Sequence, residues 1–138
     1  MKTANLALLL PMVPIRPAAA QENLLTRPAA CTDDTQTSVN ACAAAAYRAA
    51  DARLNAAYRR ILARLVDDPG RSAFVDAQRA WLRFRDAECA FVIAGNECGT
   101  IQPMLQARCL ESLTRQRTAA LESYLACTRD GCIVPPAT

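Results

Sequence analysis

The fold is decided by residues 38–65, SVNACAAAAYRAADARLNAAYRRILARL. Apolar side chains recur there at steps of three and four residues, which is the period of an amphipathic α-helix. These positions are Val39, Cys42, Ala46, Tyr47, Ala50, Leu54, Ala57, Tyr58, Ile61, Leu62 and Leu65. Arginines occupy several of the positions between them. The stretch therefore predicts one long helix that begins near Ser38.

A second helix is predicted over about residues 70–94. Asp67-Asp68-Pro69-Gly70 ends the first helix, and the same residues can start the next, because Asp68 can cap it and Pro69 suits its first position. Ser72 is the alternative cap. Gly95 offers the left-handed residue that ends many helices. The apolar positions of this helix are Phe74, Ala77, Trp81, Phe84, Cys89, Phe91 and Val92.

A third helix follows a short loop at residues 95–99. Its apolar positions are Leu105, Cys109, Leu110, Leu113, Leu121, Tyr124 and Leu125. Short connections between long helices favour antiparallel neighbours. The predicted fold class is therefore all-α, an antiparallel three-helix bundle stapled by disulfides. Around the helical domain at residues 38–127, the sequence predicts an irregular lead-in at 21–37 and a frayed tail at 128–138.

The first twenty residues have the pattern of a cleavable export signal. Lys2 precedes an apolar stretch that runs from Leu6 to Ile15, and three alanines at 18–20 suit the cleavage site. The mature chain is therefore expected to begin at Gln21. The apolar stretch is too short to span a bilayer, and no later stretch approaches the roughly twenty apolar residues that a membrane helix needs.

The charge of the mature chain is close to zero. Removal of the signal takes Lys2 and Arg16 from the 16 basic residues, which leaves 14 basic residues against 13 acidic ones. A near-neutral chain lacks the electrostatic footprint of a nucleic-acid-binding protein. We therefore expect no nucleic-acid partner.

Cysteines behind an export signal indicate an oxidising compartment, outside the cytoplasm. All seven lie beyond the signal, at positions 31, 42, 89, 98, 109, 127 and 132. Cys89 and Cys109 sit at comparable heights in a hairpin that turns near residue 97, so they form the best pair. Pairs of Cys127 with Cys132 and of Cys31 with Cys42 are also expected, which leaves Cys98 unpaired.

Metal and cofactor sites are not predicted. The chain has no histidine and no Cys-x-x-Cys motif, so zinc-site and thioredoxin-type interpretations lose their usual residues. It also has no Gly-rich phosphate loop and no dinucleotide fingerprint.

Polar side chains accompany the apolar stripes of all three predicted helices. Spacings of three and four place one set on one face of the first helix and another on one face of the second, so the sets can meet. The set comprises Asp51, Asn55, Tyr58, Gln78, Trp81, Arg85, Asp86, Thr114 and Arg117. A pair between Arg85 and Asp51 is the simplest outcome. We interpret the set as a buried, mutually bonded structural network.

Two functional alternatives use the same residues. Trp81 could be a platform and Arg85 a fork in a ligand or sugar cleft, although a lone tryptophan at this spacing is more often a core residue. An enzyme would need Arg85, Asp86 and Glu88 exposed in one cleft. Residues two apart on a helix point in different directions, and no histidine base is present, so the sequence predicts no enzyme mechanism.

Two stretches carry a resemblance to a known family: ADARLNAAY at residues 50–58 and AQRAWLRFRDAEC at 77–89. Cys31 and Cys42 precede them, and Cys109, Thr114, Arg117 and Leu121 follow in order. The chain thus resembles the LprI-type lysozyme inhibitor family, and the resemblance implies an exported helical protein that inhibits lysozyme in the cell envelope. The chain departs from the family pattern by lacking a lipobox, by its additional cysteines at 98, 127 and 132, and by GNECG at 95–99.

We therefore predict a binding protein without a cofactor. Its alternative function is that of an envelope scaffold or adaptor protein with no effect on lysozyme. Because inhibitors commonly insert a loop into a cleft, lysozyme contacts are expected on exposed loops. The contact residues predicted are Gly95, Asn96, Glu97, Gly99 and Gln102 in one loop, then Asp68 and Arg71 in another. Common lysozymes are basic, so a near-neutral chain would steer them only weakly over long range.

Overall fold

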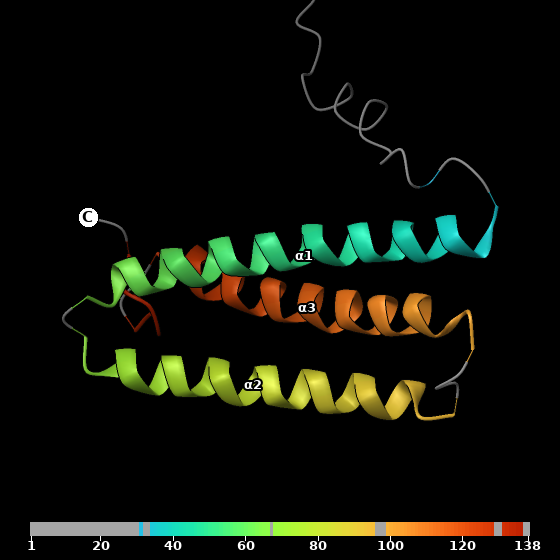
Figure 1. Ribbon diagram of the computed structural model, residues 1–138. Helices are drawn as coiled ribbons and strands as arrows, with labels where there is room; N and C mark the ends of the chain where they lie inside the picture. Colours follow the sequence, from blue (N-terminus) through green and yellow to red (C-terminus); the bar gives the residue numbers. More distant parts are fainter. Residues whose placement is uncertain (1–30, 32–33, 67, 96–98, 129–130, 137–138) are drawn as a thin grey trace, which may run out of the picture.

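The computed structural model describes residues 31, 34–66, 68–95, 99–128 and 131–136, and these contain three helices and no strand. The helices are α1 (Gln36–Arg64), α2 (Gly70–Ile93) and α3 (Gln102–Ala126) (Figure 1). The all-α prediction is confirmed. The predicted signal and most of the predicted lead-in lie outside the described residues, which include residues 31 and 34–37 of the lead-in. Within those residues, no helix combines the length and the apolar character needed to cross a membrane.

The three helices form a bundle in which α3 contacts both of the others. Close backbone approaches join α1 to α3 and α2 to α3, whereas α1 and α2 approach each other at few points. Figure 1 shows α3 between the other two. Helices that follow each other in the chain run antiparallel, so α1 and α3, the pair with the largest contact, run in the same direction.

The apolar core lies mainly between α1 and α3. Its larger cluster occupies one end of the bundle and a smaller cluster the other. The buried members of α2 are Gln78, Arg85 and Cys89, two of which are polar. The larger cluster contains Leu54, Ala57, Ile61 and Leu65 of α1, Leu121 and Leu125 of α3, and Val134 of the tail; the smaller contains Ala43, Met104 and Ala107.

A side-chain cap is found at the start of α1, whereas α2 and α3 begin without one. The side chain of Thr35 accepts a hydrogen bond from the Ser38 amide at 3.2 Å, so α1 begins two residues before the predicted start. The prediction that Asp68 caps α2 and that Pro69 takes its first position was wrong by one residue: Pro69 is the N-cap, and no side chain caps this helix. The Asp68 carboxylate instead accepts from the Gly70 amide at 2.6 Å. A Cβ at Gly70 would lie 2.9 Å from that carboxylate oxygen, so a larger residue would displace the Asp68 side chain. Ser72, the alternative cap, lies inside α2.

The prediction that a left-handed Gly95 ends the second helix was wrong. The helix ends at Ile93, and Ala94 keeps helical angles while its amide donates to the carbonyl of Phe91 at 3.2 Å. This tightened last turn satisfies a terminal carbonyl, so no left-handed residue is required there. Among the described residues, the glycine with a positive φ is Gly131, at 83°.

The prediction of a frayed tail was wrong for Val134. This residue is only 2% exposed and completes the larger apolar cluster. The chain reverses after α3 through the disulfide between Cys127 and Cys132 and through the left-handed Gly131. The reversal brings an apolar side chain to the end of the bundle, which would otherwise be open to water.

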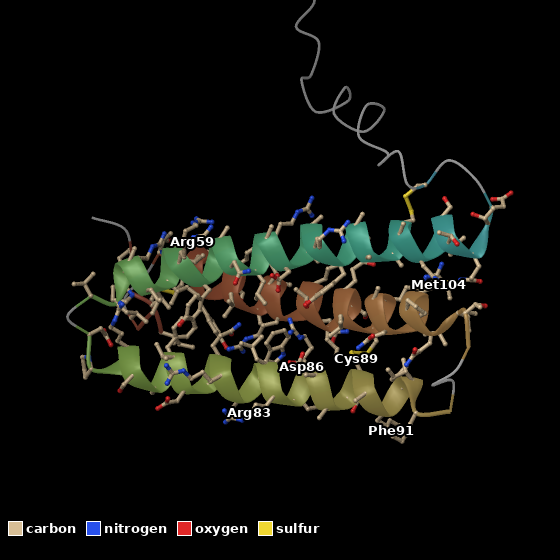
Figure 2. The ribbon with its side chains drawn as sticks, in the orientation of Figure 1. Arg59, Arg83, Asp86, Cys89, Phe91 and Met104 are labelled. Atoms are coloured by element: carbon tan, nitrogen blue, oxygen red, sulfur yellow. A yellow bond between two sulfur atoms is a disulfide. The ribbon has the colours of Figure 1, made fainter. Side chains whose placement is uncertain are left out.

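Three disulfides hold the chain together, and they join the cysteines that the sequence analysis paired. Cys31–Cys42 links the lead-in to α1, Cys89–Cys109 links α2 to α3, and Cys127–Cys132 closes the turn of the tail. Figure 2 shows Cys89 on the side of α2 that faces α3. Cys98 lies outside the described residues.

Candidate functional site

Arg85 is the centre of the polar network between α2 and α1. It is only 7% exposed. Its Nε donates to Oδ1 of Asp86 at 2.9 Å, and its Nη2 lies 2.8 Å from the same oxygen. Its Nη1 lies 3.6 Å from Oδ1 of Asp51 on α1, an ion pair without a direct hydrogen bond. The network therefore brings Arg85 and Asp51 together.

Aromatic rings surround the two guanidinium groups of the network. The Arg85 guanidinium carbon lies 5.4 Å from the ring centre of Trp81 and 5.8 Å from that of Tyr47. The guanidinium carbon of Arg117 lies 5.9 Å from the ring centre of the same Trp81. All three separations are within the range of cation–π attraction. Trp81 is partly buried and packs against the larger apolar cluster.

Tyr47 has a perturbed acidity because of this environment. Burial raises the pKa of its phenol above the usual 10.0, since the charged phenolate is poorly solvated there. The positive charge of Arg85 and a hydrogen bond with it lower the pKa, while the carboxylates of Asp51 and Asp86 raise it. Burial is the largest of these effects, and the net shift is upward.

The remaining predicted members of the network lie in three places. Arg117 donates from Nε to Oε1 of the buried Gln78 at 3.0 Å, which joins α3 to α2. Asn55 donates to Oδ2 of Asp51 at 2.8 Å and so orients the carboxylate that faces Arg85. Tyr58 stacks on Phe74 with ring centres 5.3 Å apart.

Thr114 is fully buried in α3. Its backbone carbonyl accepts from the Thr118 hydroxyl at 2.8 Å. Its own hydroxyl finds no hydrogen-bond partner in the described part of the protein. The predicted network is therefore only partly buried and partly bonded. Asn55 and Asp86 are exposed, Tyr58 contributes a ring contact, and the Thr114 hydroxyl and Nη1 of Arg85 are unsatisfied.

Two hollows flank this network, and neither is lined by Arg85 or Trp81. One, of about 400 Å³, lies between α2 and α3 and is bordered by Glu88, Val92, Leu105 and Arg108. The other, of about 340 Å³, lies beside the tail and is bordered by Phe74, Tyr124 and Ile133. Glu88 thus faces a hollow while Arg85 is buried behind Asp86. The structure does not bring Arg85, Asp86 and Glu88 into one cleft.

The two loops predicted to contact lysozyme lie at opposite ends of the bundle (Figure 1). Asp68 and Arg71 belong to the connection between α1 and α2. Both are engaged within the chain, Asp68 with the Gly70 amide and Arg71 with the carbonyl of Leu62 at the end of α1. Their contacts stabilise this turn.

The other loop connects α2 to α3. Gly95 and Gly99 are exposed, Gln102 begins α3 and is partly exposed, and Asn96 and Glu97 lie outside the described residues. The Gln102 amide donates to the carbonyl of Gly99 at 3.1 Å. Asn40 at the start of α1 donates to the carbonyl of Thr100 at 2.9 Å, which ties the loop to the bundle.

Exposed apolar side chains lie beside this second loop. Phe91 is 76% exposed, and Val92 and Ile101 are also exposed. Figure 2 shows Phe91 on the side of α2 that faces away from α3, close to the turn. Phe91 and Val92 belong to the predicted apolar stripe of the second helix, and their exposure was not predicted. The available signal was that this helix carries apolar residues on more than one face.

Comparison with known proteins gives three findings. The family model described as "Lysozyme inhibitor LprI" matches residues 28–121. The uncharacterized protein R02472 of Rhizobium meliloti (strain 1021) is 46% identical over 55 residues, which cover 38% of this chain and 38% of that protein. The chain thus matches less than two-fifths of the length of that curated relative. No solved structure matches the chain.

Proposed function

The chain belongs to the LprI lysozyme inhibitor family, and from that premise we propose that it is an exported envelope protein that binds lysozyme and blocks its cleft. The observation that carries the proposal is the family match, which runs from residue 28 through α1 and α2 to Leu121 in α3. The three disulfides support a place in the periplasm or outside the cell, because such bonds persist in oxidising compartments.

The contact surface that we propose is the end of the bundle at the α2–α3 turn. We call it the turn surface; it comprises Phe91, Val92, Gly95, Gly99, Ile101 and Gln102. Exposed apolar groups rimmed by polar backbone mark protein–protein contacts, and a few large side chains usually supply most of the binding energy. Asn96 and Glu97, predicted as contacts, belong to the same loop.

Charge also favours this surface over the others. Common lysozymes are basic, and all six residues of the turn surface are uncharged, while Glu88 and Arg108, which border the hollow beside Val92, balance each other in charge. At the opposite end, the guanidinium of Arg71 and the carboxylate of Asp68 already serve the fold. We therefore place these two residues outside the proposed contact.

The proposal is tested by a turbidity assay of cell-wall lysis. The oxidised mature protein is added at increasing molar ratio to several classes of lysozyme. We expect lysis by at least one class to stop near an equimolar ratio, as for an inhibitor that occupies the cleft. A protein that is folded by circular dichroism but leaves every class active contradicts the proposal.

Variants locate the contact. Phe91→Ser, Ile101→Ser, Glu97→Ala and Gln102→Ala address the turn surface and its loop. We expect the two serine variants to weaken inhibition roughly tenfold each, which corresponds to about 1.4 kcal/mol of binding energy. Phe84→Ser is the matched control, because Phe84 is 53% exposed on the same helix, seven residues or about 10 Å from Phe91. An equal loss in the control contradicts the assignment of the surface.

The alternative function is that of an envelope scaffold or adaptor. An exposed apolar turn surface suits any protein partner, not lysozyme alone. Capture of lysozyme without any change in lysis would favour this alternative, since binding would then leave the cleft open.

A further inference from the structure

The outer face of α1 carries a group of free arginines. Arg48, Arg53, Arg59 and Arg60 are all exposed. Within the described ranges, none of the four makes a hydrogen bond or an ion pair. Figure 2 shows Arg59 on the side of α1 that points away from α2 and α3. We call these four residues the arginine ridge.

The ridge consists of two parallel rows. At 3.6 residues per turn, Arg48 and Arg59, eleven residues apart, lie on one flank of the outer face. Arg53 and Arg60, seven residues apart, lie on the other. The exposed Ala52 lies between the rows, as do Ala49 and Ala56. From Arg48 to Arg60 the ridge extends about 18 Å along the axis.

No acidic side chain of α1 compensates this charge. The helix has one carboxylate, that of Asp51, and Asp51 faces Arg85 and Asn55 instead. Some arginines elsewhere are engaged: Arg79 and Arg115 pair with acids on their own helices, and Arg64 donates to the Leu125 carbonyl. The exposed Arg83 and Arg108 lie singly on α2 and α3. Thus four uncompensated positive charges share one face of α1 in a chain of near-neutral total charge.

We propose that the arginine ridge binds the phosphate headgroups of an anionic phospholipid surface. Guanidinium groups match phosphate oxygens in a two-pronged geometry. The alanines between the rows are small, so a flat surface can reach both rows at once. This face has no large apolar side chain to insert among acyl chains, so the contact stays at the level of the headgroups.

The rigidity of α1 supports this assignment. The inward face of the helix contains Leu54 and Ile61, which are among the most deeply buried residues of the protein. The backbone positions of the four arginines are therefore fixed before binding, so that only side-chain freedom is lost on contact. The ridge runs along the side of the bundle, whereas the turn surface lies at its end (Figure 1). A ridge bound to lipid thus leaves the turn surface free.

The test is co-sedimentation of the oxidised protein with two kinds of vesicle. One is made of phosphatidylcholine alone and the other of equal parts phosphatidylcholine and phosphatidylglycerol. We expect binding to the anionic vesicles only, and loss of binding at high salt, because surface charges are then screened. Equal binding to both vesicles, or no binding to either at low salt, overturns the proposal.

Two variants of equal net charge show whether vesicle binding depends on the arginine ridge or only on the total charge of the protein. The ridge variant replaces Arg48, Arg53, Arg59 and Arg60 with glutamine. The control replaces Arg79, Arg83, Arg108 and Arg115 with glutamine; these arginines are exposed on α2 and α3. We expect the ridge variant to bind anionic vesicles at least tenfold more weakly and the control to keep most of its binding. Equal losses overturn the proposal.

A comparison with soluble polyphosphate shows whether the arginine ridge binds a lipid surface or any source of phosphate. The folded protein is mixed with polyphosphate and with anionic vesicles in separate experiments. Binding to polyphosphate without binding to the vesicles overturns the assignment to a lipid surface. The ridge variant is also expected to inhibit lysozyme as the unmodified protein does, so failure of this inference is distinguishable from failure of the inhibitor proposal.

Discussion

Arg85 performs in this bundle the task that an apolar side chain performs between most pairs of helices. It fills space between α2 and α1 and sets how the two helices lie against each other. Its charge is balanced by Asp51 and Asp86, and its flat guanidinium rests near two aromatic rings. A buried ion pair contributes less to stability than to the choice of one arrangement, because desolvation offsets much of the attraction.

Replacement of Arg85 tests this role. Arg85→Ala is expected to lower the free energy of unfolding by about 2–3 kcal/mol, since it removes charge-assisted hydrogen bonds and the cation–π contacts. The value is modest because the carboxylates of Asp51 and Asp86 are partly exposed and return to water. Arg83→Ala, at an exposed site two residues earlier, is expected to change stability by less than about 0.5 kcal/mol. Urea denaturation followed by circular dichroism measures the free energy of unfolding of both variants, and equal losses would contradict the structural role of Arg85.

Tyr47 predicts a dependence of stability on alkaline pH. Burial raises the pKa of its phenol above 10.0 in the folded chain, so the folded chain keeps a proton that the unfolded chain releases. The corresponding stability is present below pH 10 and is lost as pH rises through the folded pKa. The absorbance of the tyrosines is titrated with pH in the unmodified protein and in Tyr47→Phe. The difference between the two curves reports Tyr47 alone, and we expect its pKa to lie above 10.0. A midpoint at or below that value refutes the shift.

At the scale of the elements, the tail differs most from what its composition suggests. Residues 131–136 include a glycine and two prolines, and a segment of this kind normally has no fixed place. Here the short disulfide loop and the left-handed Gly131 turn the chain back, and Val134 enters the core. The tail is thus a lid on the apolar cluster of α1 and α3.

Adjacent residues of the tail give a matched pair for testing the lid. Val134→Ala is expected to lower the free energy of unfolding by about 1–2 kcal/mol, because it removes buried methyl groups and leaves a cavity. Ile133→Ala loses a larger side chain, but Ile133 is 75% exposed, so its effect should stay within about 0.5 kcal/mol. Thermal denaturation of both variants provides the comparison, and similar effects would contradict a buried Val134.

At the scale of the whole molecule, the bundle is unequal. α1 and α3 share the apolar core, whereas α2 is held by a disulfide, a polar network and partly buried aromatic residues. Few buried apolar contacts mean that local opening of α2 costs less free energy than opening of the other helices. The turn surface, at the end of α2, therefore belongs to the least tightly held part of the bundle.

The Cys89–Cys109 disulfide is expected to limit this opening. Replacing both cysteines by alanine should lower the free energy of unfolding by about 3 kcal/mol and speed amide hydrogen exchange in α2 more than in α1 or α3. The control replaces Cys127 and Cys132, whose loop is shorter, and should leave exchange in α2 nearly unchanged. Uniform acceleration across all three helices in the first variant would show that α2 does not open separately.

The amino-acid sequence by itself determined the local features of this protein. The 3.6-residue period predicts the three helices with ends close to those observed, because side-chain spacing and turn chemistry act over a few residues. The heights of Cys89 and Cys109 in a helical hairpin follow from the same geometry. The spacing of the polar residues favoured a pair between Asp51 and Arg85 as the simplest outcome, and the structure contains this ion pair.

Only the tertiary structure decided which faces of the helices are covered. It placed α3 between α1 and α2, left Phe84 and Phe91 in water and buried Val134. Each of these outcomes depends on contacts between residues far apart in the chain. An apolar stripe has the same period whether a neighbouring helix covers it or water does, so its burial is set by the packing of the whole bundle.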